Sequence, residues 1–103
     1  MNLDPNTGSI ITQAQAKKLI TAFENQFPDE VIYSIIGANN VKNILNQEKC
    51  IGLRIYNGYD EEEQKISIVL VGYDQDGKDI LANGIIYDKM ATCPPLSPNV
   101  GIL

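Results

Sequence analysis

The stretch CIGLRIYNGYDEEEQKISIVLVGYDQDGKD, residues 50–79, holds two strand-like runs and two turn signals in one uninterrupted block. In the first run, aliphatic residues at positions 51, 53 and 55 alternate with a glycine, Arg54 and Tyr56, which indicates a half-buried strand. The DEEE segment at residues 60–63 carries too many like charges for the interior of a sheet. We therefore expect it to form a solvated connection between two strands.

The second run, residues 66–73, is apolar on both of its faces. One face carries Ile66, Ile68 and Leu70, and the other carries Val69, Val71 and Tyr73. A strand with two apolar faces must be covered on both sides, so the pattern predicts a central strand.

Turn and helix signals place the remaining elements around this block. DQDGKD at residues 74–79 predicts a turn, and residues 80–87 predict one more strand with a bulge or bend at Asn83 and Gly84. A capping box of Thr12 and Gln15 precedes a helix over residues 12–26, which Pro28 ends. Residues 31–36 favour a short strand, and residues 38–47 a second helix capped by Asn39 or Asn40.

These elements predict an α+β fold of order α-β-α-β-β-β, with two helices packed on one face of a small, mostly antiparallel, three- to four-stranded sheet. The length of 103 residues fits a single domain spanning residues 1–103, with a loose arm at 1–9 and an extended, proline-rich tail at 90–103. Two short helices cannot cover a sheet that is apolar on both faces. We therefore expect the tail or a second copy of the chain to cover the rest, and a homodimer through the sheet is the concrete hypothesis.

Composition and charge argue against several classes of partner. The net charge is −5 and Arg54 is the sole arginine among seven scattered lysines, so no basic stripe is present to bind nucleic acid or an anionic membrane surface. The N-terminus has no basic n-region or apolar h-region, and no apolar run approaches the roughly 20 residues of a membrane-spanning helix. We expect a cytoplasmic protein that binds neither nucleic acid nor membrane.

Common catalytic and cofactor motifs do not occur in the sequence. The chain has no histidine, which removes Ser-His-Asp catalysis, Cys-His catalysis and every His-containing metal site. It has neither a Walker A loop nor a G-x-G-x-x-G motif, and we expect no cofactor. Cys50 and Cys93 lack metal or redox spacing; whether they are bridged stays open, although we expect Cys50 to be buried and Cys93 accessible.

Two groups of residues are candidate sites. Arg54 and Tyr56 share a strand face, and Tyr73 or Tyr87 could lie beside them across the sheet, which would form a mixed cationic and aromatic patch. A structural alternative is that Arg54 is an ion-pair partner on a covered face.

Asp74, Asp76 and Asp79 around Gly77 resemble a fragment of a calcium loop, although a closing glutamate and flanking helices are missing. The alternative is a hairpin turn whose aspartates cap backbone N–H groups while Gly77 adopts positive φ.

The segments GLRIYNGYD, IVLVGYDQDGKDI, GIIYD and CPP, in this order, resemble a family of small uncharacterised bacterial proteins. The likeness runs from the first helix to the Cys-Pro-Pro segment. It implies no catalytic or binding residue, since the activity of that family is unknown to us.

The leading functional hypothesis is a non-enzymatic protein-interaction or scaffold module that associates with itself or with another protein, because the chain is small, acidic and without a common catalytic constellation. One alternative is a binder of an anionic small molecule, or an enzyme, that uses Arg54 with tyrosines and carboxylates. A second alternative is calcium binding at Asp74, Asp76 and Asp79.

Overall fold

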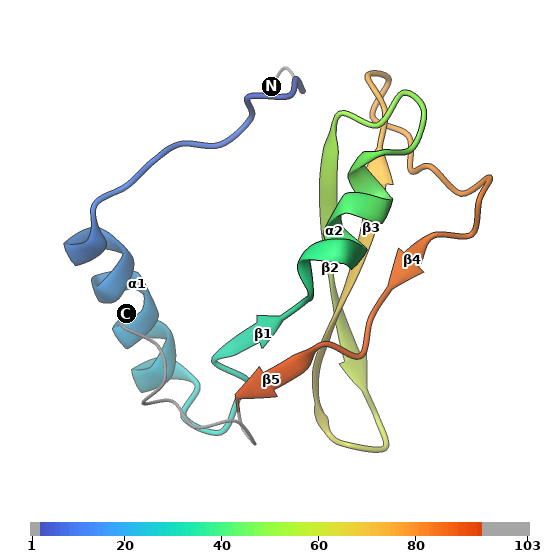
Figure 1. Cartoon of the computed structure of the whole chain (residues 1–103). Coiled ribbons are helices and arrows are strands. Elements are labelled where there is room, and N and C mark those ends of the chain that lie inside the picture. The colour runs from blue at the N-terminus through green and yellow to red at the C-terminus, as the bar shows by residue number, and fades with distance from the viewer. Residues whose placement is uncertain (1–2, 94–103) are drawn as a thin grey trace.

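The structure is a computed structural model, and it describes residues 3–93. In this part of the chain, two helices and two antiparallel sheets form an α+β structure, which confirms the predicted fold class (Figure 1). In chain order the elements are α1 (Gln13–Gln26), β1 (Tyr33–Ile35), α2 (Ala38–Leu45), β2 (Gly52–Asp60), β3 (Lys65–Tyr73), β4 (Ile86–Tyr87) and β5 (Ala91–Cys93). The strand order is β2-β3-β4 in one sheet and β1-β5 in the other.

The β2–β3 hairpin is the centre of the larger sheet. The two strands pair along nine residues each, from Gly52 opposite Tyr73 to Asp60 opposite Lys65. β3 lies between β2 and β4, so the prediction of a central strand is confirmed. The third strand is shorter than expected, because β4 has only two residues. Before β4, an isolated bridge pairs Asp79 with Tyr73 of β3.

The pairing defines two faces of this sheet. The α2 face carries Leu53, Ile55 and the side chains opposite and beside them, namely Asn57, Tyr59, Ile66, Ile68, Leu70 and Tyr87. The Arg54 face carries Arg54, Tyr56, Val69, Val71, Tyr73 and Ile86. On the Arg54 face Val71 is 2% exposed and Tyr73 8% exposed within a single chain. These two apolar residues therefore need no second copy to cover them.

The helix α2 packs on the α2 face near the C-terminal end of β3, at the open end of the hairpin (Figure 1). Its Ile44 is fully buried, and a methyl group added at Gly72 of β3 would lie 3.1 Å from Ile44 Cγ2. The helix begins at Ala38, as predicted, but its N-cap residue is Gly37, without a side-chain hydrogen bond, so the prediction that Asn39 or Asn40 caps this helix is wrong.

β1 and β5 form a separate ribbon, although we expected a single sheet. Tyr33 lies opposite Cys93 and Ile35 opposite Ala91, and the Ile32 N–H extends the ladder by donating to the Cys93 carbonyl at 2.8 Å. The first residues of the predicted tail thus form a strand, and residues 94–103 lie outside the described part of the chain. Cys93 is 2% exposed, so the expectation that it is accessible is wrong; both cysteines are free thiols.

The helix α1 has the predicted capping box but little contact with the rest of the protein. The Thr12 hydroxyl accepts from the Gln15 N–H at 3.1 Å, and the Gln15 side chain accepts from the Thr12 N–H at 2.9 Å. None of the residues of α1 is buried, and Leu19 is 66% exposed. In Figure 1 the helix stands beside the sheet, and the radius of gyration of 15.2 Å exceeds the roughly 13 Å of a compact domain of this length.

Candidate functional site

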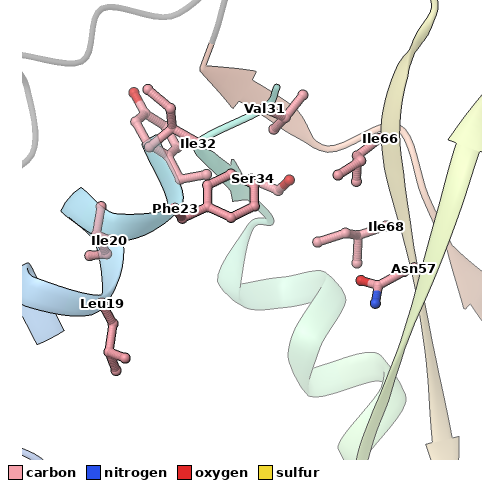
Figure 2. Close-up of a pocket in the computed structure, with 10 residues that line it drawn as sticks. Leu19, Ile20, Phe23, Val31, Ile32, Ser34, Asn57, Ile66 and Ile68 are labelled. Carbon is pink, nitrogen blue, oxygen red and sulfur yellow. The ribbon is translucent and has the colours of Figure 1, made fainter. Parts of the chain in front are cut away.

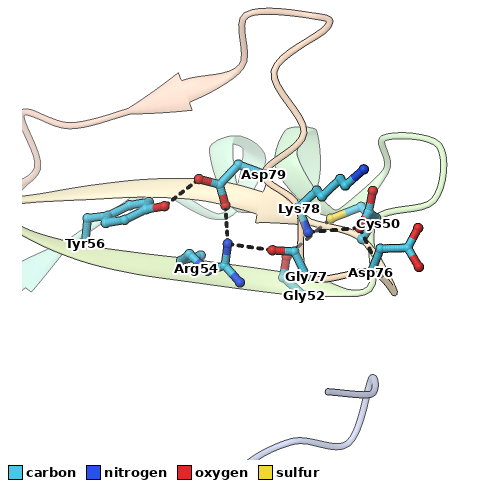
Figure 3. A network of polar contacts seen from close by, with 9 residues as sticks. Cys50, Gly52, Arg54, Tyr56, Asp76, Gly77, Lys78 and Asp79 are labelled. Atoms are coloured by element: carbon cyan, nitrogen blue, oxygen red, sulfur yellow. Dashed lines mark hydrogen bonds and ion pairs between the residues drawn. The ribbon is translucent and has the colours of Figure 1, made fainter. Parts of the chain in front are cut away.

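The candidate patch around Arg54 is a closed hydrogen-bond network (Figure 3). Arg54 Nη1 donates to Asp79 Oδ1 at 2.6 Å and to the Gly77 carbonyl at 2.9 Å. The second carboxylate oxygen of Asp79 accepts from the Tyr56 hydroxyl at 2.5 Å. The turn after β3 is in this way attached to the middle of β2.

The electrostatics of the network favour a structural role for Arg54. Desolvation lowers the pKa of Arg54, but the hydrogen bonds and charges of Asp79 and Tyr56 together outweigh it, so the pKa is raised above its ordinary value. The guanidinium carbon also lies 5.3 Å from the centroid of the Tyr73 ring, within cation–π range. The carboxylate and the carbonyl thus both accept from Nη1, and the aromatic ring lies beside the guanidinium, which is an arrangement typical of a structural ion pair.

Tyr87, the fourth residue of the predicted patch, lies on the other side of the sheet. It pairs with Leu70 on the α2 face, and its hydroxyl accepts from the Asn43 side chain of α2 at 3.1 Å. The structure therefore brings together Arg54, Tyr56 and Tyr73 but leaves Tyr87 out. Successive residues of a strand point to opposite faces of the sheet, so the face on which Tyr87 lies depends on the register between β4 and β3. The sequence does not specify this register.

The aspartates at residues 74–79 stabilise the turn. Asp74 Oδ1 accepts from the N–H groups of Asp76 and Lys78, and Gly77 has φ of 77°. Asp79 points away from them, toward Arg54 and Tyr56. In residues 3–93 no group of three or more Asp, Glu, Cys or His side chains is arranged to hold a metal ion. The geometry favours the hairpin-turn alternative over the calcium loop.

The acidic connection between β2 and β3 is also held by a local cap. Asp60 belongs to β2 as its last residue, and its Oδ1 accepts from the N–H groups of Glu62 and Glu63 at 3.0 and 3.1 Å. Only one ion pair is described in this loop, between Glu63 and Lys65 at 3.7 Å on the surface. The acidic segment therefore forms a solvated turn, which the Asp60 carboxylate caps.

An apolar hollow that the sequence motifs did not indicate lies between α1 and the sheet (Figure 2). We call it the apolar groove; its volume is about 340 Å³. Leu19, Ile20 and Phe23 of α1 line one side, and Asn57, Ile66 and Ile68 of the α2 face line the other. Residues 31–34, the segment of β1 and the two residues before it, form the third wall.

Two contacts hold the β1 wall of the groove in place. Glu30 Oε1 accepts from the N–H of Ile66 at 3.2 Å and from that of Val31 at 3.3 Å, which ties the α1–β1 connection to the start of β3. Partial desolvation, together with the charge and hydrogen bond of Cys93, raises the pKa of Tyr33 above its ordinary 10.0. This wall is therefore fixed to β3 and β5, whereas the α1 wall is not.

The sequence signal for this groove is the apolar stripe of α1, formed by Ala16, Leu19, Ile20 and Phe23 and continued by Phe27 just after the helix. Its spacing predicts that one face is buried, but periodicity does not reveal which surface buries it. Comparison of the chain with models of protein families, with curated proteins and with solved structures finds no match. Within residues 3–93, none of the helices is long and apolar enough to cross a bilayer.

Proposed function

We propose that the protein is a non-enzymatic interaction module that associates with a second copy of itself through the apolar groove and the apolar stripe of α1. The observation that supports the proposal is the exposure of α1. This helix has a full apolar stripe, yet none of its residues is buried and the groove separates it from the sheet.

A helix of this kind needs a cover to be stable in water. An isolated helix of about 14 residues is marginal, because helical stability in proteins comes mainly from packing of the apolar face. Leu19 is 66% exposed and Phe27 53% exposed, and burying such a side chain fully contributes about 1.5–3 kcal/mol. Two or three side chains covered in each copy would therefore offset a substantial part of the cost of association.

A second copy supplies both halves of the contact. Each chain presents an apolar helix and an apolar groove, so a two-fold arrangement in which the α1 stripe of one copy contacts the groove of the other uses the same surfaces twice. The lining of the groove contains no charged side chain. The apolar surfaces can then meet without burying an unpaired charge.

The test is the molar mass of the wild type and of two matched variants by size-exclusion chromatography with light scattering. Phe23→Glu places a carboxylate in the groove and is expected to yield a monomer of 11.4 kDa. Asn25→Glu introduces the same side chain on the exposed side of α1 and should leave the dimer intact. Equal masses for the two variants, or a wild type that is monomeric at all concentrations, would contradict the proposal.

The alternative of an anionic ligand at Arg54 has weaker support, since Asp79 and Gly77 already accept from its guanidinium and it does not line the apolar groove. No described contact favours a role for calcium over a turn at Asp74.

A further inference from the structure

The strand β2 is an edge strand with one side unpaired. It pairs with β3 along all nine of its residues, and within residues 3–93 no strand pairs with its outer side. In an antiparallel sheet about half of the backbone N–H and C=O groups of an edge strand point away from its neighbour. These groups form a template for another strand.

The usual protections of an edge are missing from β2. Its sequence GLRIYNGYD contains no proline and no lysine. Its two charged side chains are engaged within their own chain, Arg54 with Asp79 and Gly77, and Asp60 with the N–H groups of the following turn. The side chains at the middle and end of the strand are exposed and largely apolar, with Ile55 at 61% and Tyr59 at 59%.

The opposite edge of the same sheet shows what a protected edge looks like. β4 has two residues and offers few free backbone groups. The difference in length, nine residues against two, identifies β2 as the edge that can accept a strand.

We infer that β2 pairs antiparallel with β2 of a second copy across a two-fold axis and forms a continuous six-stranded sheet. The inference deepens the proposed function and rests on it, because it names the element of the second copy that meets this chain. Asn57 lies on β2 and also lines the apolar groove, so a copy that pairs with this edge reaches the groove as well.

The identity of the occupant follows from the strand itself. Two-fold antiparallel pairing places one residue of β2 opposite its own counterpart, and each outward N–H of one copy can then donate to an outward C=O of the other. In a full overlap of residues 52–60, Tyr56 lies opposite its counterpart and Arg54 opposite Gly58 of the other copy, so like charges do not face each other. Both charged side chains are also held by the chain that carries them. A full overlap of two such strands therefore buries no free charge.

Amide hydrogen exchange at low and high protein concentration tests the pairing directly. We expect the outward-facing amides of β2, about half of the strand, to gain at least tenfold protection when the dimer forms, while the amides of β4 remain unchanged. A dimer in which no β2 amide gains protection would overturn the inference and leave the proposed function standing. A chain that stays monomeric would remove both.

Matched substitutions provide a second measurement. Ile55→Lys puts a charge on the β2 edge, and Leu81→Lys puts the same charge at a loop position of nearly equal exposure, 59% against 61%. Circular dichroism checks that both variants fold. We expect Ile55→Lys to weaken self-association at least tenfold and Leu81→Lys to leave it within about twofold of wild type; equal effects would contradict pairing at this edge.

Cysteine scanning provides a third measurement. Residues opposite one another in an antiparallel pair have Cα atoms about 4.5–5.5 Å apart, within the range of a disulfide. Single Ile55→Cys, Tyr56→Cys and Asn57→Cys variants in a Cys50→Ser background should include one that forms a covalent dimer under mild oxidation. Gln75→Cys, at an exposed turn position, should form none. Absence of cross-linking in all three β2 variants would count against the inference.

Discussion

Substitution of Gly72 by alanine tests the packing of α2 on the sheet. A methyl group at this position would lie 2.8 Å from Cys50 Sγ, 3.1 Å from Ile44 Cγ2 and 3.2 Å from Gln47 Nε2. Ile44 is fully buried and Gln47 is 8% exposed, so neither can move into solvent without cost. All three contacts are shorter than ordinary van der Waals separations, and the new methyl group must displace its neighbours.

The expected cost follows from overpacking a small core. Inserting a methyl group into a well-packed site typically costs about 1–3 kcal/mol. For a domain of about 100 residues, each kcal/mol lowers the melting temperature by about 4–8 °C. We therefore expect Gly72→Ala to lower the melting temperature by about 4–24 °C, measured by far-ultraviolet circular dichroism at a fixed protein concentration.

A control and a double-mutant cycle isolate the cause. Gly37→Ala adds the same methyl group at a position with no atom within 4 Å and should change the unfolding free energy by less than about 1 kcal/mol. Cys50→Ala removes the nearest clashing atom, so the double variant Cys50→Ala/Gly72→Ala should recover about 1 kcal/mol relative to additivity. A Gly72→Ala protein as stable as wild type, or strictly additive effects, would refute the packing of α2 at this point.

Three further predictions concern the network, a titrating tyrosine and a helix cap. Arg54→Met should lower the melting temperature, because methionine cannot donate to Asp79 or Gly77, and Arg54→Lys should lower it less, because lysine keeps the charge but lacks the planar guanidinium beside Tyr73. Lys78→Met at an exposed turn position should leave it unchanged. Equal melting temperatures for the Arg54 variants and wild type would argue against the network. Because the pKa of Tyr33 is raised, the native state retains a proton that the unfolded chain loses above pH 10. In urea titrations the wild type should therefore lose stability relative to Tyr33→Phe as the pH rises from 9 to 11. A constant difference in unfolding free energy between the two proteins would disprove the shift. Gly37→Asp should stabilise the protein by about 0.5–1 kcal/mol in the same titrations, because the helix lacks a side-chain cap and any residue can adopt the φ of −70° at this position. A loss of stability would contradict the assignment of Gly37 as the N-cap of α2.

Local sequence signals were sufficient for the elements whose contacts are close in the chain. The Thr12–Gln15 capping box, the β2–β3 hairpin and the Asp74–Gly77 turn each depend on residues a few positions apart, and each is present as predicted. The central position of β3 followed from its two apolar faces.

Contacts between distant residues could not be predicted in the same way. The β1–β5 ribbon joins Tyr33 to Cys93, and no local pattern specifies such a pairing. Proline residues after Cys93 suggested an accessible thiol, but pairing with β1 buries it. The pairing of Arg54 with Asp79 was open from the sequence for the same reason, because it depends on how the turn folds back over β2.

The α1 stripe illustrates a different limit. Its spacing correctly predicts the helix and its apolar side, while the surface that covers this side belongs to tertiary or quaternary packing. The half-buried pattern of β2 predicts one covered face, but it does not show which strand pairs with each of its two sides.

Sedimentation equilibrium of the wild-type protein over a hundredfold range of concentration tests self-association most directly. The account predicts a molar mass that rises from 11.4 kDa toward twice that value and fits a monomer–dimer equilibrium. A mass that stays at 11.4 kDa across the whole range would contradict it.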